Sequence, residues 1–315
     1  MVTVSAPAKI HLMGEHAVVY GYPALLAAIN LRMKVTIEEK TDGSAGIDII
    51  SSDDSSYAQH ALEVFLGTFQ QANPIPARIT ITSDIPSGFH LGSSAAVAVC
   101  MSGALLFFYK KIWNPTRINE LAYEIEKKQH GNPSGGDNTA VTMGGLIWYR
   151  KELEFLKSIW QLPFKPHSSL SHFMIVNTGR PKESTGEMVA SVKVKLQQNT
   201  TFVEEQFRTN ELQTRLIAQA IKEGNEQQLI EALKTGEKTL EAIGVVSDVV
   251  LPCIRAIEQS GGAAKILGGG GIARGVGFLL CYHPNPEVLA RIVSSYDWSI
   301  DAISLGEEGV RLEQH

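Results

Sequence analysis

A stretch rich in glycine and serine between residues 83 and 96 contains the residue types that bind phosphate. It runs Ser-Asp-Ile-Pro-Ser-Gly-Phe-His-Leu-Gly-Ser-Ser-Ala-Ala, after an alternating strand pattern and before an apolar helix pattern. Glycines let backbone amides approach an anion, Ser93 or Ser94 can cap the helix, and the positive end of the helix dipole attracts phosphate. Any helix after a loop also favours a serine cap and a glycine turn, so this segment alone leaves a phosphate site and an ordinary helix start equally open.

Two other polar segments carry the charged groups that phosphate chemistry needs. Lys9 lies in Ala-Pro-Ala-Lys-Ile, and Gly-Glu-His follows at 14–16, both in apolar, strand-like surroundings. Glu126 lies on a helix pattern that ends in a Gly/Pro-rich loop carrying Asp137, so one carboxylate on the helix and one on the loop can converge. A single lysine or histidine in such a place is more often a surface or hydrogen-bonded core residue. The three segments together favour a common site.

Three competing motifs are disfavoured by their context. No GxxxxG frame in the sequence is followed by Lys-Ser or Lys-Thr, which argues against an ordinary P-loop fold. Gly-Gly-Gly-Gly-Ile-Ala at 268–273 matches the loose dinucleotide-binding pattern, but a strand pattern follows at 275–281 where that motif requires a helix. Asn-Pro-Ser-Gly-Gly at 132–136 is similar to a hydrolase nucleophile elbow, yet it lacks the first glycine and the preceding strand.

Together the three polar segments closely resemble those of the GHMP kinases, the family of galactokinase, homoserine kinase, mevalonate kinase and phosphomevalonate kinase. The first family motif is similar to residues 7–16, the second, PxGxGLGSSAA, to 86–96, and the third, a glycine run, to 265–271. The segments 14–21 and 130–138 most resemble the mevalonate kinase branch, which transfers the ATP γ-phosphoryl group to the 5-hydroxyl of mevalonate. The resemblance covers nearly the whole chain.

The resemblance implies ATP and Mg²⁺ as cofactors and a role for each matching residue. Asp137 would act as the base or orient the substrate hydroxyl, and Lys9 would pair with Asp137 and stabilise the transferring phosphoryl group. Ser94 and Glu126 would hold Mg²⁺ through oxygen ligands. The expected nucleotide-binding residues are Pro86, Gly88, Leu91, Gly92, Ser93, Ser94 and Ala95. The expected substrate-binding residues are Glu15, His16, Asp137, Gly269 and Gly270.

The resemblance also implies a two-domain α+β fold. Residues 1–167 would form a ribosomal-S5-like N-terminal domain with the phosphate loop and catalytic residues, and residues 168–315 a ferredoxin-like C-terminal domain, with the active site between them. The 315-residue length independently suits two domains or one large one.

Hydrophobic periodicity predicts the elements that position these residues. In the first half, strand patterns alternate with helix patterns, and a polar, Pro-containing stretch at 150–171 is the expected domain crossing. The strand patterns lie at 34–38, 78–82 and 144–149, and the helix patterns at 58–69 and 118–129. The second half is mostly helical: a strand at 173–176, helices at 201–223, 227–242 and 249–259, strand, turn and strand over 263–282, and a helix at 285–296.

Composition and charge favour small-molecule chemistry over nucleic-acid binding. The 28 Lys and Arg against 33 Asp and Glu give a net charge of −5, and no basic stripe is present. The cysteines are an odd number, widely spaced, and expected to be buried free thiols: Cys100, Cys253 and Cys281. The apolar run at 95–109 is too short to span a membrane and predicts a buried helix. Without a recognisable signal peptide, the protein is expected to be cytoplasmic, and the family suggests a homodimer.

Two departures from the family pattern bear on these expectations. His90 stands where the second motif has its second glycine, so a positive φ or a close phosphate approach would be strained there. The third glycine loop, at 267–271, is shorter than usual. We still expect an active kinase. Phosphomevalonate, the mevalonate 3-hydroxyl, homoserine or a sugar remain alternative acceptors, and a non-catalytic ligand-sensing regulator of the same fold is the alternative to an enzyme.

Overall fold

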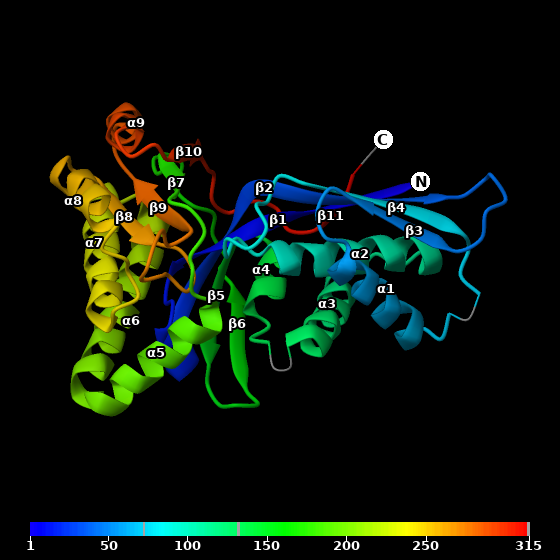
Figure 1. The fold of residues 1–315 in the computed structure, drawn as a ribbon, viewed down its shortest axis with the longest axis horizontal. Helices are drawn as coiled ribbons and strands as arrows, with labels where there is room; N and C mark the ends of the chain where they lie inside the picture. Colours follow the sequence, from blue (N-terminus) through cyan, green and yellow to red (C-terminus); the bar gives the residue numbers. More distant parts are fainter. Residues whose placement is uncertain (72, 131–132, 314–315) are drawn as a thin grey trace.

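The chain forms two sheets, each covered by helices, that lie at opposite ends of an elongated molecule (Figure 1). The computed structural model describes residues 1–71, 73–130 and 133–313, without the side chains of 128–130. The larger sheet has the order β11-β1-β2-β4-β3, and β5 and β6 extend it from β2. Its strands are β1 Val2–Met13, β2 Pro23–Glu39, β3 Ile47–Ser51, β4 Ala77–Ser83, β5 Leu146–Lys151, β6 Lys157–Gln161 and β11 Arg311–Leu312.

The long strand β2 organises this sheet. It pairs with β1 along most of its length, while its first part pairs with β5 and its last part with β4. β1 contacts helices α2, α4 and α6, and all but one of its residues are buried. Such continuous burial is typical of a strand with both faces covered. Lys9, in the middle of β1, is therefore a lysine held inside the protein.

Helices from the first half of the chain cover one face of the larger sheet (Figure 1). They are α1 Ser56–Thr68, α2 Ser93–Lys110, α3 Pro115–His130 and α4 Gly136–Met143. α2 contacts β1, β2 and the other three helices. Among the described residues, α2 is the one helix long and apolar enough to cross a membrane, and 67% of it is buried inside the protein. The expected buried helix at 95–109 is confirmed.

The smaller sheet has the ferredoxin-like arrangement that the family resemblance implied. Its order is β10-β7-β9-β8, and every pairing is antiparallel. Its strands are β7 Phe173–Asn177, β8 Ala263–Ile266, β9 Phe278–Tyr282 and β10 Ser299–Ala302. Helices intervene between β7 and β8 and again between β9 and β10, as in a βαββαβ unit. The helices are α5 Thr185–Gln198, α6 Thr200–Glu223, α7 Glu226–Ile243, α8 Leu251–Gln259 and α9 Pro286–Ser294.

The two sheets are joined by more than the connection between β6 and β7. α6 packs against β1 and β2, and β11 returns from the end of the chain to pair with β1. The change of sheet falls between residues 161 and 173, around the expected boundary at 167/168. The division into domains 1–167 and 168–315 stays a prediction.

Most expected elements are confirmed, and three of the differences have local causes. α5 was not expected, because glycine and β-branched residues weaken its helical pattern. β6 occupies part of the stretch expected to be an irregular crossing, since it is a half-exposed edge strand without strict alternation. Asp137 was placed on a loop, which was wrong: it lies in the first turn of α4. The three cysteines are buried and unpaired, as expected.

Candidate active site

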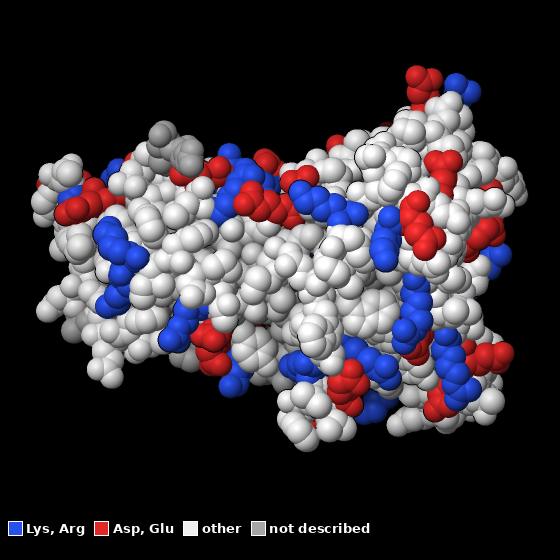
Figure 2. Space-filling model, turned by 180° about the vertical axis from the view of Figure 1, so that it is seen from behind, with Lys and Arg blue, Asp and Glu red and all other residues white. Residues whose placement is uncertain are grey.

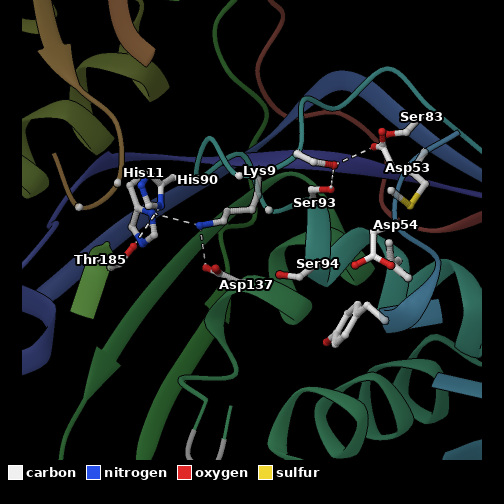
Figure 3. A pocket seen from close by; sticks show the side chains of 18 of the residues that line it. Lys9, His11, Asp53, Asp54, Ser83, His90, Ser93, Ser94, Asp137 and Thr185 are labelled. Atoms are coloured by element: carbon white, nitrogen blue, oxygen red, sulfur yellow. Dashed lines mark hydrogen bonds and ion pairs between the residues drawn. The ribbon is translucent and has the colours of Figure 1, made fainter. Parts of the chain in front are cut away.

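A cavity of about 580 Å³ lies where the two halves of the chain meet. Its wall includes Lys9 from β1, Ser94 from the start of α2 and Asp137 from α4. Thr185 of α5 and Gly268 complete it from the C-terminal half. Figure 3 shows the side chains of Lys9, Ser94 and Asp137 directed towards one another. The structure therefore brings the three polar segments of the sequence together.

Lys9 and Asp137 form an ion pair at the centre of the cavity. Lys9 Nζ lies 2.9 Å from Asp137 Oδ1, and their side chains are 4% and 38% exposed. His11, two residues along the same strand, places Nδ1 3.4 Å from Lys9 Nζ (Figure 3). Burial raises the pKa of Asp137, but the Lys9 ammonium and the nearby imidazoles outweigh it and hold that pKa below its usual value. Asp137 is thus a carboxylate at neutral pH, able to accept a hydrogen bond from an alcohol.

The loop before α2 has the backbone geometry of an anion site. Gly88 and Gly92 have φ values of 83° and 79°, and Gly92 precedes α2 without a side-chain cap. The expected serine cap was therefore wrong, and the N-terminal amides of α2 are not occupied by a capping side chain. A side chain at Gly92 would meet Lys9 Cγ at 2.8 Å. The backbone amide of Lys9 also donates to Leu91 O at 3.0 Å, which ties the loop to β1.

The expected nucleotide-binding residues divide into two groups. Gly88, Gly92, Ser93 and Ser94 line the cavity, whereas Pro86, Leu91 and Ala95 are not among its lining residues. Leu91 and Ala95 are each 1% exposed and pack in the core. Leu91 and Ala95 thus anchor the end of the loop and the start of α2 in the core, and the predicted contact of all three residues with nucleotide stays untested.

Of the two expected metal ligands, Ser94 lines the large cavity, whereas Glu126 is not among the lining residues of either cavity. Glu126 is buried on α3, and among the described residues it has no ion-pair partner. Burial and the Asp137 charge raise the pKa of Glu126 to about 8. A buried carboxylate that faces another carboxylate is costly unless a cation lies near it. Oxygen donors such as the Glu126 carboxylate and the Ser94 hydroxyl are those that Mg²⁺ prefers, and Mg²⁺ commonly uses only one or two protein ligands. No group of three His, Cys, Asp or Glu that could hold a metal occurs in the described part of the chain.

Glu15 and His16 form one wall of the cavity and are anchored from the C-terminal half. Glu15 is ion-paired with Lys265 of β8, and both side chains are almost completely buried. His16 Nε2 lies 3.0 Å from the carbonyl oxygen of Gly269, which also lines the cavity. Gly270 is not among the lining residues, because it packs against the Val245 backbone and a side chain there would overlap it. Of the two expected glycines, only Gly269 faces the site.

A second cavity of about 190 Å³ adjoins the first. His11, Val18, Val19 and Asp137 line both cavities, so the Lys9–Asp137 pair lies at their junction. Tyr149 and two lysines add polar groups to the smaller cavity. The Asp137 carboxylate therefore borders both cavities.

The sequence analysis missed several residues of the site. His11 could have been found from its spacing, since residues two apart on a strand share a face. Thr185 and Asp53 come from distant segments, and no motif marked them. Lys265 was noted only as part of the third glycine segment. Gly131 and Asn132, expected in the loop before α4, lie outside the described residues.

Comparisons with known proteins give consistent results. The family model described as the GHMP kinases N terminal domain matches residues 56–145. The mevalonate kinase of Archaeoglobus fulgidus is 34% identical over 279 residues, which cover 85% of this chain and 88% of that protein. The crystal structure of L. major mevalonate kinase in complex with R-mevalonate has a TM-score of 0.82 at 21% identity, covering 97% of this chain and 96% of that one. Streptococcus pneumoniae phosphomevalonate kinase, in complex with phosphomevalonate and AMPPNP, has a TM-score of 0.77 at 20% identity and covers 97% of this chain and all of that one.

Proposed function

The chain belongs to the GHMP kinase family, and from this premise we propose that it transfers the γ-phosphoryl group of ATP to the 5-hydroxyl of mevalonate. The observation that carries the proposal is the Lys9–Asp137 pair at 2.9 Å, at the junction of a cavity with a phosphate-type loop and a smaller second cavity. Relatives named mevalonate kinase over most of the chain length support mevalonate as the acceptor. The product would be 5-phosphomevalonate, an intermediate of isoprenoid biosynthesis.

The reaction is a single displacement at phosphorus. The acceptor oxygen bonds to the γ-phosphorus while the bond to the ADP oxygen breaks, and the hydroxyl proton passes to Asp137 and then to solvent. Because the pKa of Asp137 is low, its carboxylate chiefly orients the hydroxyl and takes the proton late. Lys9, 2.9 Å from Asp137, would stabilise the negative charge on the transferring group.

Mg²⁺ would be held by Ser94 and Glu126 and would neutralise charge on the nucleotide phosphates. The loop of Gly88, Gly92, Ser93 and Ser94 would position the phosphates through backbone amides and hydroxyls. Glu15 and His16 would form the wall of the acceptor site, held in place by Lys265 and Gly269.

The direct test is ADP release by purified protein with ATP, Mg²⁺ and mevalonate, with identification of the phosphorylated carbon by ³¹P and ¹³C NMR. We expect mevalonate-dependent ADP release and phosphate on C5. A panel of phosphomevalonate, homoserine and galactose tests the sibling activities, and phosphate on C3 would assign a 3-kinase. ATP binding without turnover on any acceptor would indicate a ligand-sensing protein.

We further propose a cytoplasmic homodimer that binds neither nucleic acid nor membrane. Three buried, unpaired cysteines are consistent with a reducing compartment. Figure 2 shows positive and negative side chains interspersed on one face, without a basic patch. Light scattering coupled to gel filtration tests the dimer, and a monomer at micromolar concentration would reject it.

A further inference from the structure

His90 is an unusual residue for its position in the phosphate loop. Its φ is 63°, in the left-handed region between the positive-φ glycines Gly88 and Gly92. Histidine adopts this conformation more readily than most side chains, but glycine would adopt it without strain. A strained residue at a functional loop calls for a compensating contribution from its side chain.

The His90 side chain reaches across to the C-terminal half of the chain. Its Nδ1 lies 3.3 Å from Thr185 Oγ1 at the start of α5 (Figure 3). Its ring packs on Gly268, where any side chain would overlap it. His90 therefore links the phosphate loop to two segments that are distant in sequence, and these contacts define the orientation of the imidazole.

The imidazole lies beside the reacting groups rather than outside the site. His90 lines the large cavity together with Lys9 and Asp137. Burial and the Lys9 charge lower the pKa of His90, while Asp137 opposes them, so the ring is neutral at pH 7. The other titratable groups that face this centre are His11 on β1 and His16 beside the third glycine loop.

Among the described residues, Lys9 is the one lysine or arginine that lines the large cavity, and it already contacts Asp137. The Arg180 guanidinium lies against Gly88 of the phosphate loop but is not among the lining residues. A nucleoside triphosphate would bring several negative charges to this place, so additional donors are needed. The contact between Nδ1 and Thr185 Oγ1 is compatible with either group as donor; in the tautomer that accepts from Thr185 Oγ1–H, the single proton of the neutral ring resides on Nε2. Among the described residues, Nε2 has no hydrogen-bond partner.

We propose that His90 binds the terminal phosphate of the nucleotide through Nε2–H, with Thr185 fixing the tautomer and orientation of the ring. This proposal rests on the proposed use of ATP but concerns binding, so it can be tested without an acceptor. It assigns to a side chain a contact that a glycine at residue 90 could not make.

The experiment compares ADP with the non-hydrolysable analogue AMPPNP by calorimetry, in the presence of Mg²⁺. We expect His90→Gly to weaken AMPPNP binding about tenfold and ADP binding less than twofold, because a hydrogen bond to a charged group contributes on this scale and ADP lacks the terminal phosphate. The exposed His167 provides the control, and His167→Asn should leave both affinities unchanged. Equal loss for both nucleotides, or no loss, would overturn the proposal.

Two conservative variants separate a phosphate donor from a mere link between the halves. Asparagine tolerates a positive φ and can reach Thr185 with the atoms that replace Nδ1, but it is too short to replace Nε2. Glutamine places an amide N–H near the Nε2 position. We expect His90→Asn to bind AMPPNP as weakly as His90→Gly, and His90→Gln to recover part of the loss. Full recovery by His90→Asn with none by His90→Gln would assign His90 a structural link only.

Discussion

Two lysine–carboxylate pairs lie within the same site and differ in their access to ligand. Lys9 pairs with Asp137, whose side chain is 38% exposed and lines both cavities. Lys265 pairs with Glu15, and these side chains are 0% and 3% exposed. The first pair can exchange its partner for a phosphate or a hydroxyl, whereas the second is almost closed to solvent: Glu15 contributes to the cavity wall, and Lys265 holds it in place. The two pairs have the same residue types, so it is their access to ligand that makes the first suited to catalysis and the second to structural support.

The buried pair also belongs to a cluster with an excess of acid. Glu237 of α7 is fully buried, accepts a hydrogen bond from the Ile266 amide at 3.0 Å, and leaves Oε1 without a partner among the described residues. Burial raises the pKa of Glu237 to about 8, although Lys265 lowers it. Lys265 is thus ion-paired with Glu15 and lowers the pKa of Glu237 without contacting it, and the raised pKa favours the protonated form of Glu237 at neutral pH.

The largest expected effect comes from the Lys9–Asp137 pair, which is open to ligand. Lys9→Met should lower kcat about 10⁴-fold, because Lys9 both stabilises the transferring charge and positions Asp137. Thermal unfolding should change little, since Asp137 can be solvated when its partner is removed. Steady-state kinetics and calorimetry measure the two quantities, and Lys34→Met, at an exposed lysine of β2, is the control. A loss of stability comparable to that of a Lys265 variant would erase the distinction between the pairs.

The buried, sealed pair of Lys265 and Glu15 should show the opposite pattern, with its main effect on stability. Lys265→Met leaves buried acids without their cation and should cost about 3–5 kcal/mol in the free energy of unfolding. Urea unfolding at pH 7 measures this, with Lys234→Met as control because its pairing with Glu231 is at the surface and should contribute less than about 1 kcal/mol. Glu15→Gln combined with Lys265→Met should recover more than half of the loss. If Lys265→Met lowered the free energy of unfolding no more than Lys234→Met does, the structural role of the sealed pair would be contradicted.

A smaller effect is expected from Glu126, the proposed Mg²⁺ ligand. Glu126→Gln should raise the Mg²⁺ concentration for half-maximal activity at least about tenfold, because a carboxylate ligand is replaced by a neutral amide. Glu124→Gln is a matched control, since Glu124 lies on the same helix but pairs with Lys127 on the surface. An unchanged Mg²⁺ requirement in Glu126→Gln would remove Glu126 from the metal site.

The sealed cluster of Glu15, Lys265 and Glu237 should also show a pH dependence of stability. Because the pKa of Glu237 is raised from 4.5 to about 8 in the folded state, the native protein binds more protons than the unfolded chain between these values. The free energy of unfolding should therefore fall as pH rises through this window, by up to about 1.4 kcal/mol per pH unit from this group. Glu237→Gln should reduce the slope, and Glu205→Gln, at an exposed position, should leave it unchanged. Identical slopes in all three proteins would refute a protonated Glu237.

Much of the fold could be predicted because the relevant patterns are local. The buried helix α2 follows from a continuous apolar run, and β4 from strict alternation. α5 and β6 could not be predicted in this way, since one has weak helix formers and the other is an edge strand supported mainly by β5. Their stability comes from tertiary contacts rather than from local preference.

The candidate site also contains features that could be predicted from the sequence and features that could not. The motifs identified Lys9, Ser94 and Asp137, because phosphate chemistry requires particular residue types at particular places in a loop or strand. They did not show that Asp137 begins a helix, that Gly270 packs away from the cavity, or that His90 contacts Thr185. Each of these depends on which distant segment lies opposite.

The sequence by itself determined the types of group available to this protein: an amine, carboxylates, hydroxyls and glycine turns in three motifs. Only the tertiary structure decided that Lys9 lines the cavity and that Lys265 is completely buried. The physical reason is that residue chemistry is local, whereas burial and charge pairing depend on contacts between segments as far apart as Glu15 and Lys265. Those contacts exist only once the two sheets have packed together.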